Sequence, residues 1–127
     1  MIYPGLYVDH TEKKGKAVFT NQALEPGLVI EVSPVVVMNS EDRIHLDKTL
    51  LHDYIFEWGE EKDKCCMALG FIPMYNHSYH SNCEYFMDYA EETIFVKTVR
   101  KIEAGEELTI NYNGDWNDET PVWFDVV

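Results

Sequence analysis

The sequence predicts one mostly β domain with a single helical insertion, and three observations support this fold class. Short runs rich in β-branched and aromatic residues fill the first third of the chain and return in its last third, with turn residues between them. Only the middle segment has apolar residues at helical spacing. A chain of 127 residues, 46% of them hydrophobic, is also the size of one domain around one core, so residues 1–127 are expected to form a single domain.

Three strands are expected in the first third of the chain. The runs Gly5–Val8, Lys16–Asn21 and Leu28–Met38 are rich in residues that favour extended backbone. Turn residues such as Pro26-Gly27 separate them. The pattern therefore predicts short strands joined by tight turns, without an internal repeat.

The helical insertion is expected at about residues 41–60. Apolar and aromatic residues recur there at the three- and four-residue spacing of one helix face, namely Ile44, Leu51, Tyr54, Ile55 and Trp58. Ser40 or Asp42 would cap the start of this helix, and Gly59 would end it. One amphipathic helix is the predicted content of this segment.

A hairpin and one further strand are expected after the insertion. Cys83–Tyr89 and Thr93–Arg100 carry many aromatic and β-branched residues and flank the turn Ala90-Glu91-Glu92. A last strand is predicted through Leu108–Tyr112, and residues 113–127 follow as a C-terminal tail.

The charge balance favours basic partners. The chain has 10 Lys and Arg against 23 Asp and Glu, and its formal net charge of -13 repels phosphate backbones and anionic lipid surfaces. Direct binding of nucleic acid and contact with a membrane are therefore not expected. Solubility alone explains most of the acidic residues, so only a cluster around a site would give them a function.

The sequence also favours a soluble protein of the cytoplasm or of another intracellular compartment. The first residues show no basic region followed by an apolar run, and the most apolar stretch, Val29–Met38, is too short to span a bilayer. The three cysteines are Cys65, Cys66 and Cys83. An odd number with two adjacent members suits a disulfide framework poorly, which favours a reducing compartment.

Two polar motifs near the C-terminal end are the most informative part of the chain. Asn76-His77-Ser78 directly follows the apolar segment Ala68–Tyr75, and Asn82 comes four residues after the serine. Gly105-Glu106-Glu107-Leu108-Thr109 is followed closely by Tyr112. Amide, imidazole and hydroxyl groups beside a buried segment need hydrogen-bond partners. Taken alone, the first motif is more typical of a capped turn.

Together with Lys14-Gly15-Lys16-Ala17-Val18-Phe19, which follows the predicted first strand, these motifs resemble the active-site pattern of SET-domain protein lysine methyltransferases. The three occur in the family's order and span nearly the whole chain, so the resemblance is far more specific than any one motif. The chain departs from the family where Ala17 replaces a frequent second glycine, Pro73-Met74 a frequent Arg-Phe pair and Asn111 a frequent Asp. None of these changes removes a core chemical group.

The resemblance implies a fold of small β-sheets in which the two C-terminal motifs cross in a knot-like arrangement, braced by Asn82. It implies S-adenosylmethionine as the cofactor, S-adenosylhomocysteine as the product and no metal. Small residues of the glycine motif would approach the cofactor through their backbone, and Asn76 and His77 would hold its amino-acid and adenine parts. The implied cofactor-binding residues are Gly15, Lys16, Ala17, Met74, Asn76, His77 and Tyr112.

By the same resemblance, the reaction is methyl transfer to the side-chain amine of lysine in a basic protein or peptide, with Tyr112 as the catalytic tyrosine. The site has to align the attacking amine with the methyl group and the sulfur, and burial beside a positive charge favours the neutral amine. No protein base is required, so His77 is not assigned as one. Tyr7 and Tyr85 are further catalytic candidates, since their hydroxyls would line the lysine channel. Ordinary half-buried packing is the alternative for both.

The C-terminal tail lacks the cysteine-rich zinc segment with which many histone methyltransferases of this family close their active site. Trp123 and Phe124 would instead form an aromatic lid and contact the substrate together with Tyr75 and Tyr85. Equally, the two tail residues would anchor the tail to the core or to a second copy of the chain. The small size of the chain is compatible with a homodimer.

Alternatives remain beside this hypothesis. A catalytically inactive SET-fold module that binds basic peptides or acts as an interaction protein is the runner-up. Zinc is disfavoured although His77, His80 and Cys83 are spaced like ligands, since a fourth ligand is not obvious. Acidic residues at the end of the predicted helix, such as Glu57, would either attract a basic peptide or simply form a solvated helix end.

Overall fold

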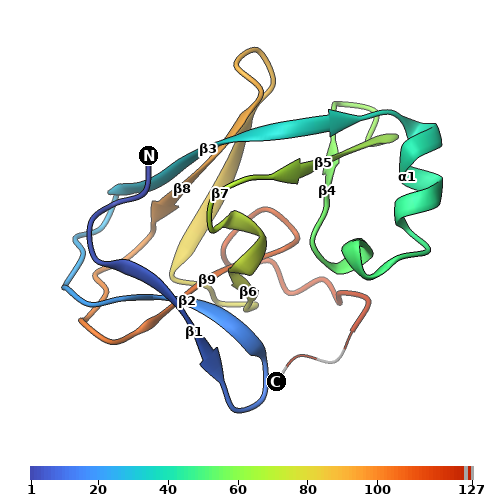
Figure 1. Cartoon of the computed structure of the whole chain (residues 1–127). Coiled ribbons are helices and arrows are strands. Elements are labelled where there is room, and N and C mark those ends of the chain that lie inside the picture. The colour runs from blue at the N-terminus through green and yellow to red at the C-terminus, as the bar shows by residue number, and fades with distance from the viewer. Residues whose placement is uncertain (125, 127) are drawn as a thin grey trace.

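Two small β-sheets and one short α-helix make up most of the regular structure of residues 1–124 and 126, which are the residues that the computed structural model describes (Figure 1). The first sheet has the order β1-β2-β9-β6, formed by β1 Leu6–Thr11, β2 Gly15–Thr20, β9 Glu107–Ile110 and β6 Asn76–His77. The second has the order β4-β5-β3-β8-β7, formed by β4 Phe56–Trp58, β5 Lys64–Ala68, β3 Val29–Met38, β8 Thr93–Thr98 and β7 Cys83–Asp88. The predicted mostly β fold is confirmed.

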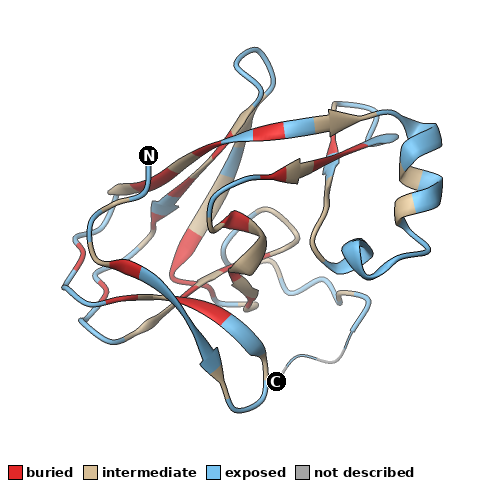
Figure 2. Cartoon of the chain, in the orientation of Figure 1, coloured by how far each residue is buried: buried red, intermediate tan, exposed pale blue. Residues whose placement is uncertain are grey.

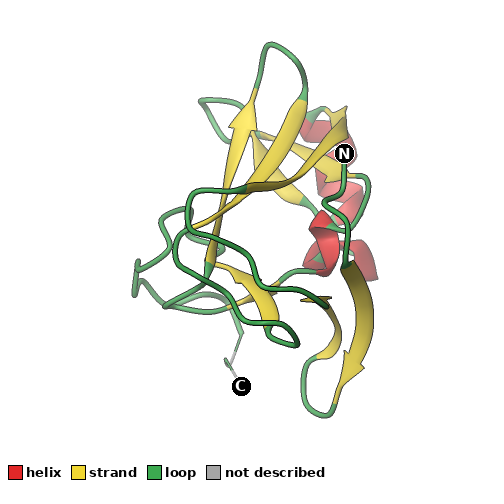
Figure 3. Ribbon diagram, turned by 90° about the vertical axis from the view of Figure 1, so that its left-hand side faces the viewer, coloured by secondary structure: helices red, strands yellow, loops and turns green. Residues whose placement is uncertain are grey.

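The helical elements fill the connections between strands. The α-helix α1 spans Ser40–Leu46 and the 3₁₀ helix η1 spans Leu50–Asp53, and both lie between β3 and β4 at the end of the molecule away from the β1-β2 hairpin (Figure 1). The 3₁₀ helix η2, Ile72–Met74, leads into β6. Long loops make up one side of the molecule, and the helices lie on the other (Figure 3).

The β1-β2 hairpin has a turn that its own sequence fixes. β1 and β2 pair in antiparallel register up to Thr11 and Gly15. The Lys14 N–H donates to the Thr11 hydroxyl at 2.8 Å, and that hydroxyl donates to the Gly15 carbonyl at 3.0 Å. Gly15 has a φ of +74°, a conformation that costs little only for glycine. The turn therefore holds Lys14 at the end of the hairpin.

The two polar motifs of the C-terminal half lie side by side. β6 runs parallel to β9, with Asn76 opposite Thr109 and His77 opposite Ile110. Asn82, on the loop that leaves β6, donates from its side-chain amide to the Glu107 carbonyl at 2.8 Å and accepts from the Thr109 N–H at 2.8 Å. Asn82 therefore braces the return of this loop to β9, as predicted.

The hydrophobic core lies where the two sheets meet, and Figure 2 shows the buried segments along the central strands. Alternate residues of β8 and β9 point into it, so that Ile94 and Val96 on β8 and Leu108 and Ile110 on β9 are fully buried. By contrast, α1 has no buried residue and covers little of the core.

The predicted helix over residues 41–60 is wrong in its length. α1 ends at Leu46, and the side chain of Asn39, rather than Ser40 or Asp42, caps its start by accepting from the Asp42 N–H at 2.8 Å. Thr49 then caps the separate turn η1. The residues at helical spacing share no packed face, since Ile44 is 59% exposed. Trp58 belongs to β4 and pairs with Lys64 instead.

The strands β4, β5 and β6 were not predicted. Each has only two to five residues, and none shows the alternation of a half-buried strand over a useful length. β5 contains Cys65 and Cys66, which are buried and free like Cys83, and burial raises the pKa of the Cys66 thiol to about 12. Within residues 1–124 and 126, no helix is long and apolar enough to cross a membrane.

Candidate active site

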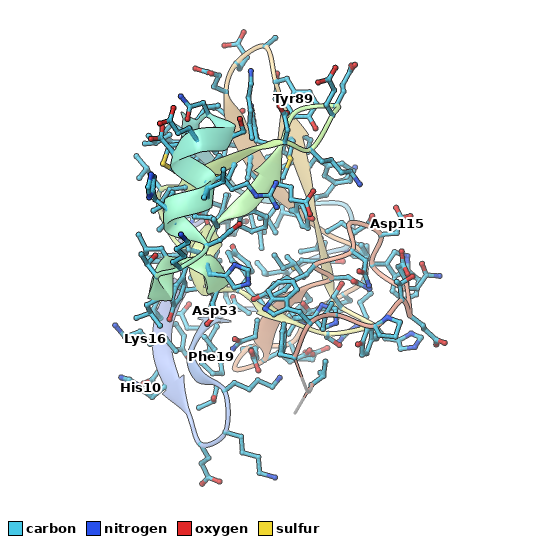
Figure 4. The ribbon with its side chains drawn as sticks, turned by 90° about the vertical axis from the view of Figure 1, so that its right-hand side faces the viewer. His10, Lys16, Phe19, Asp53, Tyr89 and Asp115 are labelled. Atoms are coloured by element: carbon cyan, nitrogen blue, oxygen red, sulfur yellow. The ribbon has the colours of Figure 1, made fainter. Side chains whose placement is uncertain are left out.

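Two cavities meet at Tyr112. A larger cavity of about 490 Å³ lies between the insertion, η2, β7 and the C-terminal tail, and Asp53, Phe56, Tyr75, Tyr85, Tyr112 and Trp123 are among the residues that line it. A smaller cavity of about 270 Å³ lies at the β1-β2 turn and β6, lined by Lys13, Lys14, Asn76, His77, Tyr112, Phe124 and Val126. In Figure 4, Asp53 and Tyr89, both from the larger lining, lie at the centre and the upper end of the view, with Lys16 of β2 below them.

Every backbone and side-chain polar group of Tyr112 has a partner. Its N–H donates to His77 Nδ1 at 3.0 Å, and its hydroxyl donates to the Tyr75 carbonyl at 2.9 Å. Its own carbonyl accepts from the Tyr85 hydroxyl at 3.1 Å. Burial raises the pKa of the Tyr112 phenol to about 12, so it stays protonated at neutral pH. The ring is therefore held in one orientation between the two cavities.

Tyr85 adds a second buried phenol to the larger cavity. Its ring meets Phe56 edge to face at 5.2 Å, and burial raises the pKa of its hydroxyl to about 12. The structure thus brings the two predicted tyrosines Tyr85 and Tyr112 into direct contact through a hydrogen bond. Tyr7 is not brought there: it lies on β1, is 38% exposed and stacks on Phe19 at 5.6 Å. A catalytic role of Tyr7 stays a prediction.

The buried carboxyl group of Glu31 holds Tyr75, and through it Tyr112, in position. Glu31 on β3 is fully buried and accepts from the Ser33 hydroxyl at 2.6 Å, the Phe71 N–H at 2.9 Å and the Tyr75 hydroxyl at 3.1 Å. Burial raises the pKa of Glu31, although these hydrogen bonds oppose the shift. Gly70 makes room for it, because a Cβ there would clash with the carboxyl group. Glu31 thereby fixes Tyr75, whose carbonyl holds Tyr112.

The sequence contained a signal for Glu31 that went unused. Glu31 is a lone acidic residue within the apolar run of β3. A charged residue in such a run either lies on a solvated face of the strand or is buried with partners. Its partners lie 2, 40 and 44 positions away in the chain. Only the fold shows that a carboxyl at this position is enclosed.

The smaller cavity brings two polar segments together. The Asn76 side-chain amide donates to the Lys16 carbonyl at 3.1 Å and to Glu107 Oε2 at 3.0 Å. Lys14 Nζ donates to Glu107 Oε1 at 3.3 Å. The backbone of Lys16 is therefore tied to Asn76, and its predicted backbone contact with the cofactor stays a prediction. Neither Lys14 nor Glu107 was predicted as a site residue.

His77 presents an unused hydrogen-bonding atom at this cavity. Its Nδ1 accepts from the Tyr112 N–H, so the proton of the neutral ring is on Nε2. Burial lowers the pKa of His77, which favours that neutral form. Nε2 is buried and has no hydrogen-bond partner among the described residues. A buried donor without a partner suits a site that a ligand fills.

The C-terminal tail contacts residues of both cavities. Trp123 stacks on Tyr112, with ring centroids 5.8 Å apart and planes at 20°, and also meets His52 of η1 at 6.0 Å. Phe124 lies 6.0 Å from the rings of His77 and Tyr112. The predicted substrate residues Tyr75, Tyr85 and Trp123 thus line the larger cavity, whereas Phe124 lines the smaller one.

Some predicted cofactor residues lie beside the smaller cavity and not in its lining. Gly15 and Ala17 belong to β2, where Ala17 is fully buried, and Met74 packs against the core from η2. The candidate zinc ligands do not come together, since no group of three or more His, Cys, Asp or Glu residues in the described part of the chain is placed to hold a metal ion.

A family model and a related protein both place this chain in the same family. Residues 15–113 match the family model described as the SET domain. A histone-lysine N-methyltransferase of Schizosaccharomyces pombe, specific for H3 lysine-37, is 35% identical over 121 residues, which cover 94% of this chain and 77% of that protein.

Solved structures show the same fold. A crystal structure of a Plasmodium falciparum protein assigned as a histone methyltransferase, PFL0690c, has a TM-score of 0.68 and 25% identity, covering 91% of this chain and 98% of that one. The ctPRC2 complex, in an autoinhibited conformation bound to S-adenosylmethionine, contains a chain with a TM-score of 0.73 and 18% identity, covering 87% of this chain and 15% of that one. At that identity the second likeness shows the fold alone.

Proposed function

This chain belongs to the SET-domain family, and from that premise we propose that it is a protein-lysine N-methyltransferase that uses S-adenosylmethionine and releases S-adenosylhomocysteine. Transfer of a group from a cofactor to a protein side chain needs two binding sites that meet at one point. The observation that carries the proposal is Tyr112, which forms part of the wall of both cavities and has all its polar groups held.

The residues of the smaller cavity fit the cofactor. The unpartnered Nε2–H of His77, the amide of Asn76 and the charge of Lys14 offer polar contacts to a charged molecule rich in heteroatoms. When bound, the cofactor supplies an activated methyl group on a positively charged sulfur. We assign its binding to Gly15, Lys16, Ala17, Met74, Asn76, His77 and Tyr112, with the glycine segment contributing through its backbone.

The larger cavity is proposed to take the substrate lysine. Aromatic side chains, with Tyr75, Tyr85 and Trp123 among them, suit the apolar stem of lysine. The carboxylates of Asp47, Asp53 and Glu57 also line this cavity, and negative charge there attracts a basic segment. We propose a histone segment as the substrate, because the fission-yeast relative is named for histone H3, and an intracellular location follows from that substrate.

The chain's own groups favour the reaction without a protein base. The carboxylates attract the charged amine, whereas the phenols of Tyr85 and Tyr112 stay neutral and add no negative charge beside the reacting group. Desolvation among aromatic rings and repulsion by the cofactor's positive sulfur favour the reactive neutral amine there. His77 does not act as the base, since its Nδ1 already accepts from the Tyr112 N–H. The Tyr75 carbonyl fixes the Tyr112 hydroxyl at the meeting point of the cavities.

The test is an assay of purified protein with S-adenosylmethionine and core histones, read by mass spectrometry of methylated lysines. Wild type should add methyl groups. Tyr112→Phe should fold and bind S-adenosylhomocysteine, yet lose about 100-fold in rate, the size typical of one hydrogen-bonding group at a reacting centre. Cofactor binding without methylation of any histone would favour an inactive peptide-binding module, and an unchanged rate in Tyr112→Phe would reject the role of Tyr112.

A further inference from the structure

The charges on the wall of the larger cavity do not balance. Among the described residues of this lining, the cations are Arg43 and Lys62, and the carboxylates are Asp47, Asp53 and Glu57. The Arg43 guanidinium lies 3.8 Å from a carboxylate oxygen of Asp47 and 3.8 Å from one of Glu57. Two of the three carboxylates therefore have a positive partner within the protein.

Arg43 is fixed at the α1 and β4 side of the cavity. Besides its ion pairs, its guanidinium donates to the Lys62 carbonyl at 2.7 Å, which ties α1 to the turn between β4 and β5. Its side chain is only 26% exposed. An arginine held by several groups does not swing away to serve another carboxylate, so its charge stays with Asp47 and Glu57.

Asp53, the last residue of η1, is the carboxylate that this network leaves out. None of the ion pairs formed among residues 1–124 and 126 includes it. The neighbouring His52 meets Trp123, and Trp123 stacks on Tyr112, which places the end of η1 towards the reacting group. After burial, the charge of Asp53 is the next cause that raises the pKa of the Tyr112 phenol. An unmatched negative charge therefore faces the Tyr112 end of the cavity (Figure 4).

This charge would conflict with the reaction if the target lysine were its partner. The attacking amine has to be neutral, and a carboxylate close to it would stabilise the charged form. A second basic side chain of the substrate removes the conflict, because it pairs with Asp53 and leaves the target amine free. The cavity of about 490 Å³ is roughly 8 Å across, and an extended peptide advances about 3.3 Å per residue, so the two basic side chains have to be close in sequence.

We infer that Asp53 determines substrate choice by pairing with a second basic side chain within about three residues of the target lysine. This inference rests on the proposed function, because it concerns the substrate of the same reaction. It narrows that substrate from any basic segment to one with a lysine or arginine beside the methylated lysine.

Kinetics of wild type and Asp53→Asn with matched peptides test the inference. The probe is a synthetic peptide around the histone lysine that wild type methylates, with versions in which each neighbouring Lys or Arg is replaced by Gln. One replacement should lower kcat/KM of wild type about 3- to 10-fold, the effect expected of a partly exposed charge contact, and change that of Asp53→Asn less than about 2-fold. Asp53→Asn should lower kcat/KM for the unaltered peptide by the same factor as that replacement. Glu41→Gln, an exposed position of α1 outside the cavity lining, is the matched control and should keep the full preference.

The outcomes separate this inference from the proposed function. An equal loss for every peptide in Asp53→Asn would mean that Asp53 acts on the target lysine itself or on the fold, and would overturn the inference while methylation stands. Equal rates of wild type on all the peptides would overturn it as well. Failure of wild type to methylate any histone would reject the proposed function, and the inference would fall with it.

Discussion

The crossing of β6 with β9 and the insertion between β3 and β4 differ sharply in how they are held. At the crossing, Asn82 and His77 are buried, and side-chain hydrogen bonds join segments far apart in the chain. In the insertion, α1 and η1 have no buried residue, and their capping bonds are local and exposed. Yet residues of both regions line the larger cavity.

The two regions serve the candidate active site in different ways: one fixes the reacting group, and the other forms a wall of the substrate cavity. The reacting group needs a fixed position, and the buried contacts around Tyr112 provide it. The wall that meets a variable substrate needs no such rigidity, and an exposed, locally held segment tolerates change. Substitutions near the crossing should therefore lower the stability of the fold strongly, whereas substitutions in the insertion should change it little.

The largest effect is expected for Glu31→Ala. Removing the carboxyl leaves the Ser33 hydroxyl, the Phe71 N–H and the Tyr75 hydroxyl buried without their acceptor. Even at the lower part of the usual range of about 1–3 kcal/mol for each such group, the three together give an expected loss of roughly 3–5 kcal/mol in the free energy of unfolding. Urea titration measures it. Glu57→Ala on β4, where the side chain is 54% exposed, is the control, and an equal loss there would contradict the special cost of removing a buried carboxyl.

Sequence reasoning predicted the two regions with very different success. The strands with alternating or β-branched residues and the polar motifs were placed correctly, because their signals are local. The spacing of Ile44, Leu51 and Trp58 predicted one helix, but period alone does not show whether a face has anything to pack against. Glu31 and the pair of Lys14 with Glu107 were missed, because their partners come together only in the fold.

The next effect is expected for Asn82→Ala. It removes one bond to the Glu107 carbonyl and one from the Thr109 N–H, both at 2.8 Å, where β9 is held to the crossing. Two partly buried backbone groups lose their partner, so the free energy of unfolding should fall by roughly 2–4 kcal/mol. The same change at the helix cap, Asn39→Ala, should cost only about 1 kcal/mol. Equal midpoints in thermal unfolding for the two variants would show that the crossing is no more constrained than the insertion.

A smaller effect should appear as a pH dependence of stability. Burial raises the pKa of Glu31 above its ordinary value, so the folded state holds this proton more tightly than the unfolded chain. The contribution of Glu31 is then fully present below the unfolded pKa and is lost as pH rises through the folded pKa. Glu31→Gln should abolish this loss of stability with rising pH, because the amide does not titrate. Urea midpoints of both proteins at a series of pH values check it, and a constant difference between them would be contrary evidence.

The smallest effect is expected in the insertion, for Ile44→Ala. This side chain is 59% exposed and has no buried neighbour in α1, so its truncation should change the free energy of unfolding by less than about 0.5 kcal/mol. Ile94→Ala, the same change at a fully buried position of β8, should cost about 2–5 kcal/mol. Chemical unfolding of the two variants side by side measures the gap. A large loss from Ile44→Ala would mean that α1 packs against another surface in solution, such as a second copy of the chain, and would contradict the contrast between a rigid crossing and a weakly packed insertion.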